Sequence, residues 1–553
     1  MTKPASSEPI LIIGERRSVA QGLAAGLRRQ GQSAVLRRAP EAQAELARLR
    51  PASLIVAPEL SSSLDWSPQP QEAVGLAEGA AQLGLRRLIL LSSTLIYPPS
   101  HHHPGYVDES YKTARPAPGP ARRWADYEER LRAAADSPKA PALCVLRTAP
   151  LLGPAGQGPF RHLVDSGLPI TPLGYDPTLQ ILHEDDLVQA VLAALETSPE
   201  GVFNVVPSQA IPVRQALQLA GSRRLPLPVS LQRPLRRLLS PLGAAAHPGW
   251  IEYLRHSFTA SGLQASRQLG FEARYTSAQA VLARTGGKPR HGSSDGPVSP
   301  PRYDRFGLDR DYVRSRVLLR FMHDIYWRIE ESGWENVPRQ GRAVLVGIHR
   351  GFMPWDGVML MHGAVQNSGR FPRFLIHPSL VKFPGLATFM TKMGGVPSNH
   401  ENADWVLQND HILGVYPEGI HGAFTPYREA YSLGRFGRSD FVRIALRNRA
   451  PILPVVTAGS AEIFPILGRL DWKWFRRFTE WPYLPITPTF PLAPLPLPSK
   501  WHTRFLPPFH IEDEHPPQAA DDPALVRRIS IRVRDAMQEA VEELLRQRKS
   551  IWR

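Results

Sequence analysis

Apolar and polar positions alternate along the first half of the chain in the manner of an α/β protein. Short apolar runs are separated by stretches in which apolar residues return at helical spacing, as Leu23 and Leu27 do. The runs are ILII at 10–13, SAVL at 33–36, LIVA at 54–57, RRLILLSS at 86–93 and ALCVLR at 142–147. Strands that alternate with helices in this way predict a doubly wound parallel sheet with crossover helices.

The second half has a similar pattern and also predicts an α/β domain. A helix is expected at about 311–331, and a final amphipathic helix from Pro523 to about Arg548. Between them, four apolar runs predict strands: RAVLVGI at 342–348, RFLIH at 373–377, HILGVYP at 411–417 and APILPVV at 450–456. Glycine, serine and proline replace this pattern at 286–301, which indicates a linker. We therefore expect domains at 8–285 and 303–553, joined by a linker at 286–302.

Composition and charge limit the classes of protein to which this chain can belong. A length of 553 residues requires more than one core, and 42% apolar with 21% charged residues excludes a disordered or fibrous chain. The single cysteine, Cys144, excludes a disulfide scaffold and favours a reducing, cytosolic compartment. The first apolar run is too short for a secretory signal. The net charge of +16 favours an anionic partner. Because no nucleic-acid-binding motif or basic tail is present, nucleic acid is disfavoured as this partner. The remaining candidates for the anionic partner are a membrane surface and an acidic substrate.

The segment LIIGERRSVAQG at 11–22 has the strand, glycine turn and helix start that open a dinucleotide-binding unit. Together with RRLILLSSTLIY, VLRTAPLLGP and ILHEDDLVQAVLAALE, it resembles the NAD-dependent epimerase/dehydratase family of extended short-chain dehydrogenases. The resemblance implies a Rossmann-like fold for the first domain. It also implies four candidate cofactor-binding residues: Gly14, Arg17, Ala20 and Ser92.

The chemistry of that family is incomplete in this chain. Arg17 places a side chain where the backbone would approach a pyrophosphate; it can bind phosphate as a cation, but a lost cofactor site is the favoured interpretation. The family also needs a tyrosine with a lysine four residues later, so that the ammonium lowers the pKa of the phenol. None of the four lysines in the first 290 residues has such a tyrosine, and the helix ARRWADYEERL has Ala or Trp in its place. We expect a pseudo-oxidoreductase domain, for which NAD(P) binding stays open.

In the second half, His349 directly follows a predicted strand and Asp356 lies seven residues later, in HRGFMPWD. On one continuous helix the two would lie about 10 Å apart along the axis, too far for a hydrogen bond. Gly351 permits a turn, and Pro354 suits the first turn of a helix that would carry Asp356 near its start. His349 can then fold back onto the carboxylate and accept a proton from a hydroxyl that attacks an acyl carbonyl. Taken alone, the pair is more simply a strand-end histidine and a helix-capping aspartate.

Three further blocks accompany the pair in order: FPGLATFMTKMGGVPSNHENA at 383–403, VYPEGIHGAF at 415–424 and APILPVVTAG at 450–459. Together the four blocks resemble the glycerolipid (lysophosphatidic acid) acyltransferase superfamily, most closely its monoacylglycerol- and diacylglycerol-acyltransferase-like branch. The resemblance implies an α/β acyltransferase fold with His349 as general base and Asp356 as its partner. The acceptor-binding residues that it implies are Pro417, Glu418, Gly419, His421, His400 and Arg428.

The chain departs from this family's pattern around the site. Ile348 and Arg350 flank the histidine where the family usually has Asn and a small residue. His421 and His400 stand where phosphate-acceptor members carry arginine, and a neutral imidazole is a poor substitute for a guanidinium. A phosphate-bearing acceptor is therefore in question. The cations that could compensate are Lys392, Arg428, Arg435 and Arg350.

The sequence contains no run of roughly 18 uninterrupted apolar residues, which is the length of a spanning helix. Two stretches of the second half nevertheless suit a membrane surface. The stretch 481–499 is uncharged but holds seven prolines, the first five at every third residue, which is the period of polyproline II. The preceding DWKWFRRFTEW at 471–481 interleaves aromatic and cationic residues, which suits the headgroup region of an anionic bilayer. The helix at 311–331 has a similar apolar side, which can equally pack on the core.

We therefore expect a membrane-peripheral O-acyltransferase that acts on a glycerolipid hydroxyl, either of 1-acylglycerol-3-phosphate or of a mono- or diacylglycerol. By resemblance, the thioester donor is acyl-CoA or acyl-carrier protein, and no metal or further cofactor is needed. The protein is expected in the cytoplasm, on the inner face of the cell membrane, with a non-catalytic first domain. Two alternatives stay open: an NAD(P)-dependent oxidoreductase or epimerase with an accessory lipid-binding half, and a non-enzymatic lipid-binding scaffold.

Overall fold

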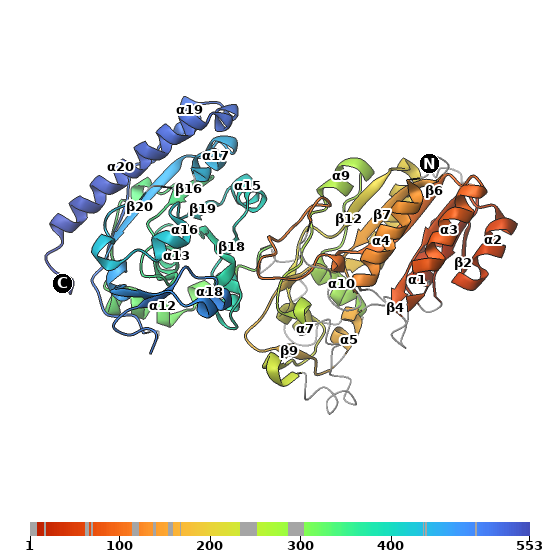
Figure 1. Cartoon of the computed structure of the whole chain (residues 1–553), viewed down its shortest axis with the longest axis horizontal. Helices are drawn as coiled ribbons and strands as arrows, with labels where there is room; N and C mark the ends of the chain where they lie inside the picture. Colours follow the sequence, from red (N-terminus) through yellow and green to blue (C-terminus); the bar gives the residue numbers. More distant parts are fainter. Residues whose placement is uncertain are drawn as a thin grey trace. The chain divides into compact units, whose positions relative to one another are not determined.

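Two compact units make up the chain, Met1–Gly307 and Leu308–Arg553 (Figure 1). The computed structural model describes residues 8–15, 18–60, 66–67, 70–112, 121–136, 140–152, 159–165, 167–232, 251–285, 304–434, 436, 439–492 and 495–552. The expected linker at 286–302, Arg17 and Arg435 lie outside these ranges.

The first unit is built on six parallel strands that pair in the order β2-β1-β3-β6-β7-β12. These strands are β1 (Ile10–Ile13), β2 (Ala34–Arg37), β3 (Ser53–Val56), β6 (Arg87–Ser93), β7 (Ala142–Thr148) and β12 (Gly201–Val205). Each of the five apolar runs forms one of them, as expected for strands that are covered on both faces. The order reverses at β1, because β2 lies on one side of it and β3 on the other, which is the switch point of a doubly wound sheet.

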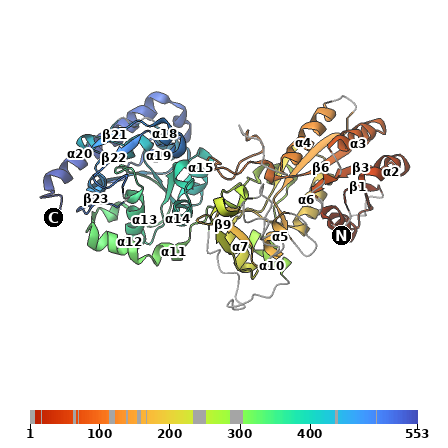
Figure 2. The same cartoon turned by 60° about the horizontal axis from the view of Figure 1, so that its bottom comes forward.

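Alternate residues of these strands face two separate hydrophobic clusters. Leu11 and Ile13 pack into one cluster, and Ile10 and Ile12 into the other. The first cluster includes α2 (Ala42–Leu49), α3 (Pro70–Gln82) and α4 (Arg122–Ala135), and the second includes α1 (Val19–Arg29), α6 (Glu184–Thr197) and α9 (Leu263–Leu269). Figure 2 shows β6, β3 and β1 between α3 and α4 on one side and α6 on the other. The expected Rossmann-like, doubly wound fold is confirmed.

The remaining described elements of the first unit are short. They are η1 (Ala39–Glu41), β4 (Glu59–Leu60), β5 (Trp66–Ser67), η2 (Thr94–Ile96), β8 (Leu151–Leu152), α5 (Pro159–Asp165), β9 (Ile170–Pro172), β10 (Thr178–Leu179), β11 (Leu182–His183), β13 (Ile211–Pro212), α7 (Val213–Leu219), β14 (Leu225–Leu227), η6 (Glu252–Leu254) and α10 (Ser277–Arg284).

The second unit is built on a seven-stranded mixed sheet in the order β15-β23-β20-β16-β19-β17-β18. Its strands are β15 (Glu330–Ser332), β16 (Ala343–Val346), β17 (Arg373–Ile376), β18 (Val396–Pro397), β19 (Ile412–Val415), β20 (Ile452–Ala458) and β23 (His502–Phe505). Five of them run parallel, whereas β23 is antiparallel to β20 and β15 runs parallel to β23. The four strands expected from the apolar runs are β16, β17, β19 and β20.

Helices pack on both faces of this sheet. Leu345 of β16 packs in the same cluster as α13 (Trp355–Asn367), which α11 (Arg310–Arg314) and α12 (Val317–Phe321) contact. From the other side, α17 (Asp440–Arg447) contacts β16, and the long α20 (Pro523–Gln547) runs alongside β20 (Figure 1). The other described elements are η7 (Met322–Tyr326), η8 (Trp334–Asn336), η9 (Pro378–Val381), α14 (Leu386–Lys392), α15 (His400–Gln408), α16 (Gly419–Ala423), η10 (Tyr427–Glu429), η11 (Ser460–Ile463), β21 (Gly468–Leu470), α18 (Lys473–Thr479), β22 (Leu484–Ile486), α19 (Ile511–Glu514) and η12 (Pro517–Asp521).

Three neighbouring strands of this sheet end in the segments expected to be functional. The strand β16 leads to His349, β19 leads to Pro417, and β20 leads to Gly459. Because β16 lies between β19 and β20 and all three are parallel, their carboxyl ends meet at one edge of the sheet. This edge brings the histidine loop beside the Pro-Glu-Gly segment.

Two expectations about elements are wrong. The helix expected at 311–331 consists of α11, α12 and the π-helical turn η7, because Ser315 ends α11 and Arg316 has an extended conformation (φ −80°, ψ 91°). The proline-rich stretch 481–499 is not one continuous polyproline helix, since β22 within it pairs with β21. Among the described helices, none combines the length and the apolar character needed to cross a bilayer.

Candidate active site

His349 and Asp356 are joined by a hydrogen bond of 2.6 Å between Nδ1 of the imidazole and Oδ2 of the carboxylate. The loop after β16 permits this contact because Gly351 has a φ of +76°, a conformation that glycine adopts at little cost. Pro354 is the N-cap residue of α13, so Asp356 lies in the first turn of that helix. The helix start and the folded-back histidine that the sequence predicts are both present.

Two backbone groups also hold the carboxylate of Asp356. The amides of Arg350 and Gly357 donate to it at 3.1 and 2.7 Å. The Asp356 side chain is 1% exposed and that of His349 is 15% exposed. Because Nδ1 faces this fixed carboxylate, the imidazole is held in one orientation, and Nε2 is the nitrogen left to face a substrate.

The ring of Tyr416 lies against the imidazole of His349, with the ring centroids 5.0 Å apart. Two glycines make room for it: a Cβ on Gly347 would lie 2.7 Å from the Tyr416 ring, and one on Gly357 would lie 3.2 Å from its hydroxyl. Burial, followed by the nearby charge of Asp356, raises the pKa of this phenol well above its ordinary value, so it stays neutral. Sequence reasoning missed Tyr416, and the one available signal was its position before Pro417 at the end of β19.

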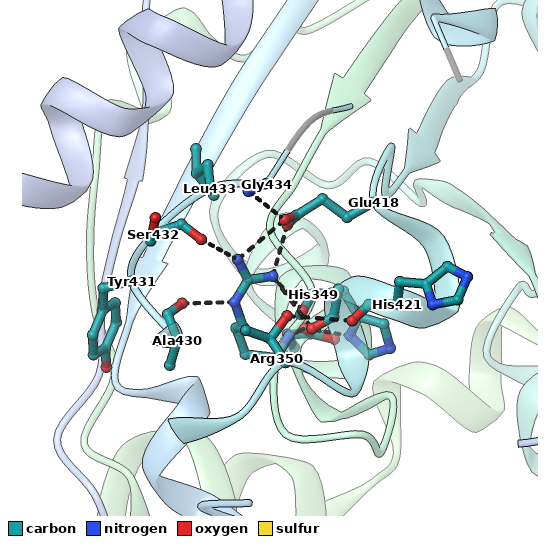
Figure 3. Close-up of polar contacts among 12 residues, drawn as sticks. His349, Arg350, Glu418, His421, Ala430, Tyr431, Ser432, Leu433 and Gly434 are labelled. Carbon is teal, nitrogen blue, oxygen red and sulfur yellow. Dashed lines mark hydrogen bonds and ion pairs between the residues drawn. The ribbon is translucent and has the colours of Figure 1, made fainter. Parts of the chain in front are cut away.

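Arg350 and Glu418 form a buried ion pair that joins the histidine loop to the Pro-Glu-Gly segment (Figure 3). Nη1 and Nη2 of Arg350 donate to the two carboxylate oxygens of Glu418 at 2.7 and 3.3 Å, and the side chains are 1% and 9% exposed. The guanidinium also donates to the backbone carbonyls of His349, Gly422, Ala430 and Ser432. A guanidinium that makes all of these hydrogen bonds is not free to bind a phosphate. The geometry of Arg350 therefore does not fit the phosphate-binding role considered for it in place of the missing arginines.

Glu418 has a second partner in the amide of Gly434, which donates to its Oε1 at 2.9 Å. Both oxygens of its carboxylate are therefore engaged within the protein, and its contact with an acceptor stays a prediction. The adjacent Pro417 is half-buried, and Gly419 is exposed with a φ of +58°. The amide of Gly419 donates to the carbonyl of Tyr416 at 2.8 Å, which closes the turn between β19 and α16.

The other residues expected to bind the acceptor lie on the surface. His421 is exposed on α16, and Figure 3 shows its ring directed away from the Arg350 guanidinium. His400 is exposed at the start of α15, and the Arg428 side chain is 84% exposed, 3.6 Å from Glu429. Within the described part of the chain, no hydrogen bond or ion pair connects the side chains of these three residues to His349 or Asp356. Lys392 is buried over the ring of Tyr312.

A second buried network holds the segment 430–434 from its other side. The hydroxyl of Tyr431 donates to the carboxylate of Glu462 at 2.6 and 2.7 Å, and Arg548 binds the same carboxylate at 2.5 Å. Gln538 of α20 donates to the carbonyl of Tyr431 and accepts from the amide of Leu433. The segment that receives the Arg350 guanidinium is thus also fixed to the C-terminal helix, a contact that sequence reasoning missed.

Aromatic side chains pack directly after the histidine loop. Phe352 contacts four rings at centroid distances of 5.0 to 5.9 Å: those of Phe424, Phe464, Trp481 and Phe490. The His349–Asp356 pair therefore lies beside an apolar cluster, which is compatible with a lipid substrate.

The candidate cofactor residues of the first unit are tightly packed where the structure describes them. A Cβ on Gly14 would lie 2.4 Å from the Cβ of Ala20, so the two residues serve the packing of α1 on β1. The hydroxyl of Ser92 donates to Glu128 at 2.5 Å, and Glu128 is also bound by Arg147 at 2.7 Å. Trp124, one of the residues at the expected tyrosine position, is buried in the core. Ser92 is thus part of a buried network in this unit.

Comparison with known proteins identifies relatives of this chain. Residues 328–458, which include the histidine loop and the Pro-Glu-Gly segment, match the acyltransferase family. The uncharacterized protein Rv0502 of Mycobacterium tuberculosis is 37% identical over 257 residues, which is 45% of this chain and 71% of that protein. A human protein named DGAT1/2-independent enzyme synthesizing storage lipids is 27% identical over 173 residues, 31% of this chain and 52% of that protein.

Solved structures resembling the N-terminal half are NAD-dependent epimerases and related enzymes. MoeE5 in complex with UDP-glucuronic acid and NAD has a TM-score of 0.39 and 17% identity, covering 50% of this chain and 98% of that one. Thermus thermophilus UDP-glucose 4-epimerase with NAD has a TM-score of 0.39 and 16% identity, covering 50% and 98%. The Rossmann-like fold rests on the strand order described above. Because the mycobacterial relative is matched over more than two thirds of its length, and residues 328–458 match the family itself, this chain belongs to the acyltransferase family.

Proposed function

We propose that the protein transfers an acyl chain from a thioester donor to a hydroxyl of a glycerolipid, with His349 as general base and Asp356 as its partner. The observation that carries the proposal is the 2.6 Å hydrogen bond between Nδ1 of His349 and Oδ2 of Asp356, at the edge where β16, β19 and β20 end. The family match over residues 328–458 spans this edge and supports the same chemistry.

In the proposed reaction, Nε2 of His349 takes the proton of the acceptor hydroxyl as its oxygen attacks the thioester carbonyl carbon. The tetrahedral intermediate then collapses, the carbon–sulfur bond breaks, and the proton on the imidazole passes to the leaving thiolate. Asp356 keeps the proton of the neutral imidazole on Nδ1 and stabilises the imidazolium that forms in between. The donor is acyl-CoA or acyl-carrier protein, either of which supplies the thioester.

The acceptor that the site supports best is a neutral mono- or diacylglycerol. His400 and His421 replace the arginines that would grip a phosphate, and the Arg350 guanidinium is committed to Glu418. The human relative, which is named as an enzyme synthesizing storage lipids, supports the same acceptor class. The second acceptor to test is 1-acylglycerol-3-phosphate.

The first unit is proposed to have no oxidoreductase activity of its own. Its lysines lack the tyrosine partner that proton transfer requires, and Ser92 is committed to Glu128. Calorimetry with NAD(P)H checks this part of the proposal. Tight binding would favour the alternative of an active oxidoreductase with an accessory lipid-binding half.

To test the proposed function, the purified full chain is incubated with labelled acyl-CoA and one of three acceptors: monoacylglycerol, diacylglycerol or 1-acylglycerol-3-phosphate. Wild-type protein is expected to acylate a neutral acceptor, and His349→Ala to lower the rate by about 10³-fold. His510→Ala removes an exposed histidine of the same unit, 56% exposed, and is expected to leave the rate unchanged. If wild type transfers no faster than His349→Ala to any acceptor, the non-enzymatic scaffold should replace this proposal.

A further inference from the structure

Exposed apolar side chains gather in one part of the second unit. Of the twenty large hydrophobic side chains that are exposed among the described residues, eight lie between residues 467 and 495. Six of these lie in β21, α18 and β22 or directly next to them, and we name them the aromatic platform: Leu467, Leu470, Trp472, Trp474, Phe478 and Ile486. Soluble proteins rarely expose so many large apolar side chains together unless a partner covers them.

The aromatic rings of the platform contact each other while they stay open to solvent. Trp474 and Phe478 stack with centroids 5.5 Å apart and an interplanar angle of 2°, and Trp472 contacts Trp474 at 5.4 Å. The three residues are 50% to 61% exposed. Trp474 and Phe478 are four residues apart on α18, so they share one face of the helix. The three rings therefore form a preformed apolar face within the platform.

Positive charge surrounds the platform, and the acids near it are already paired. Asp471 binds Arg476 at 3.1 Å, and Glu480 binds Lys382 at 3.0 Å. Over the described ranges, Arg469, Lys473 and Arg477 have no acidic group within 4.0 Å. Apolar rings among uncompensated cations fit the headgroup layer of an anionic bilayer, where the rings enter the interface and the cations meet lipid phosphates.

A row of aromatic contacts connects α18, the helix that carries Trp474 and Phe478, to the histidine loop. Phe475 of α18 contacts Trp481 at 5.8 Å, and Trp481 contacts Phe352 at 5.6 Å. Phe352 lies three residues after His349. Two aromatic side chains, Phe475 and Trp481, thus link the helix that carries Trp474 and Phe478 to the loop of the proposed general base.

A second exposed apolar strip is linked to the other half of the catalytic pair. It lies on α12 and η7 and consists of Val317, Leu318, Phe321 and Ile325, which are 43% to 80% exposed. The next residue, Tyr326, donates to the carbonyl of Pro496 at 2.8 Å. Trp327 contacts Trp355, which directly precedes Asp356, at 5.4 Å.

We infer that the aromatic platform docks the second unit onto an anionic lipid surface. This inference rests on the proposed function, because docking would deliver a lipid hydroxyl to His349 from the bilayer. Tryptophan side chains favour the boundary between headgroups and acyl chains, and lysine and arginine bind acidic headgroups. The uncompensated cations favour a lipid surface over a second copy of this chain, whose matching face would repel them.

The test is sedimentation of the full chain with vesicles of phosphatidylcholine, alone or with about one third phosphatidylglycerol. Wild-type protein is expected to sediment mainly with the anionic vesicles. The variant Trp474→Ala/Phe478→Ala should raise the lipid concentration for half-maximal binding about tenfold, and Lys473→Gln/Arg477→Gln should abolish the preference for anionic vesicles. Ile531→Ala, an exposed apolar residue of α20 that is 40% exposed, is the matched control and should bind as wild type does.

Three results would overturn the inference: wild type that ignores both kinds of vesicle, platform variants that sediment as wild type does, or platform variants that change only the oligomeric state. The last result would assign the platform to a second copy of the chain. His349→Ala should sediment as wild type does, so the failure of the proposed catalysis and the failure of docking are told apart. Unchanged melting temperatures of the variants show that a loss of binding is not a loss of fold.

Discussion

Three donors converge on the carboxylate of Asp356: the ring of His349 and the backbone amides of Arg350 and Gly357. The carboxylate is almost fully buried, so water competes little for its oxygens. Orientation of the imidazole therefore depends on the chain itself, through a loop of six residues between the two side chains. Tyr416 packs against the ring from one side, and burial raises the pKa of its phenol so that it stays protonated and is not available as a base.

The variant Asp356→Asn is expected to lower kcat/KM by about 10²- to 10⁴-fold while KM changes little. The amide is neutral and can present a donor to Nδ1, so the imidazole loses both its favoured tautomer and the charge that stabilises the imidazolium. Steady-state kinetics of acyl transfer measure the effect, and a melting curve controls for folding. A change confined to KM would mean that Asp356 serves substrate binding.

The variant Glu418→Ala is expected to lower the free energy of unfolding by about 3–5 kcal/mol and to reduce activity with it, because it leaves the Arg350 guanidinium buried without its counter-ion. Arg428→Ala, at an exposed position that follows the same segment, is the control and should change stability by less than about 0.5 kcal/mol. Denaturant unfolding compares the two. If Glu418→Ala kept its stability and only raised KM, the acceptor-binding role of Glu418 would be supported instead.

The sequence predicts the His349–Asp356 contact because its causes are local: a glycine that permits the turn and a proline that starts the helix. The Arg350–Glu418 pair has no such local signal, since 68 residues separate its members along the chain. Its formation requires β16 and β19 to be neighbours in the sheet, which the apolar runs do not specify. Tyr416 was missed for the same reason, because its ring meets His349 only across that strand pair.

Among the helices and strands, the C-terminal helix α20 contributes contacts that hold the segments around the candidate site. Gln538 and Arg548 hold the segment 430–434 and Glu462, while Arg350 holds that segment from the side of the histidine loop. The helix is thus connected to the histidine loop through one short segment of chain. Burial lowers the pKa of the Arg548 guanidinium, whereas the nearby Glu462 carboxylate and Tyr431 raise it. The net effect is a raised pKa.

The variant Arg548→Ala is expected to destabilise the second unit by about 3–5 kcal/mol, because the Glu462 carboxylate would stay buried without its cation. Arg546→Ala, an exposed position one half-turn earlier on α20, provides the comparison and should have little effect. Thermal or denaturant unfolding measures both variants. Equal stability of the two would show that α20 is held by its apolar face alone.

The start and end of α20 could be predicted closely from its apolar spacing and from Pro523 at its first turn. The helix expected at 311–331 could not, because its apolar residues keep helical spacing although Arg316 breaks the helix. Four of its apolar side chains point to solvent, so the periodicity there reflects an exposed surface and not burial against a core. Periodicity alone does not distinguish these two situations.

For the whole molecule, the two units have separate hydrophobic clusters and should respond differently to acid. In the first unit, burial lowers the pKa of His103 and of His256 from the usual 6.5 to about 3, with Arg255 adding to the effect on His256. Both are therefore neutral in the folded unit, whereas an unfolded chain would take up a proton on each below pH 6.5. Their contribution to stability is complete above about pH 6.5 and is lost as the pH falls toward 3.

Acidification from pH 7.5 to 5 is thus expected to destabilise the first unit by up to about 1.4 kcal/mol per pH unit for each of these histidines once the pH is below 6.5. Hydrogen–deuterium exchange of peptides from β6 and β12, measured in the full chain, reports this unit separately. The variant His256→Gln should show a shallower dependence than wild type. Exchange in these strands that is independent of pH, after correction for the intrinsic rate, would contradict the buried neutral state.

The proposed mechanism requires that His349 and Asp356 act as one unit in acyl transfer. A double-mutant cycle in kcat/KM with a neutral glycerolipid acceptor tests it most directly, using His349→Ala, Asp356→Asn and the two combined. Because Asp356 acts only through the imidazole, the double variant is expected to be no slower than His349→Ala alone. If the two losses multiply in the double variant, the carboxylate works independently of the histidine and the proposed mechanism is contradicted.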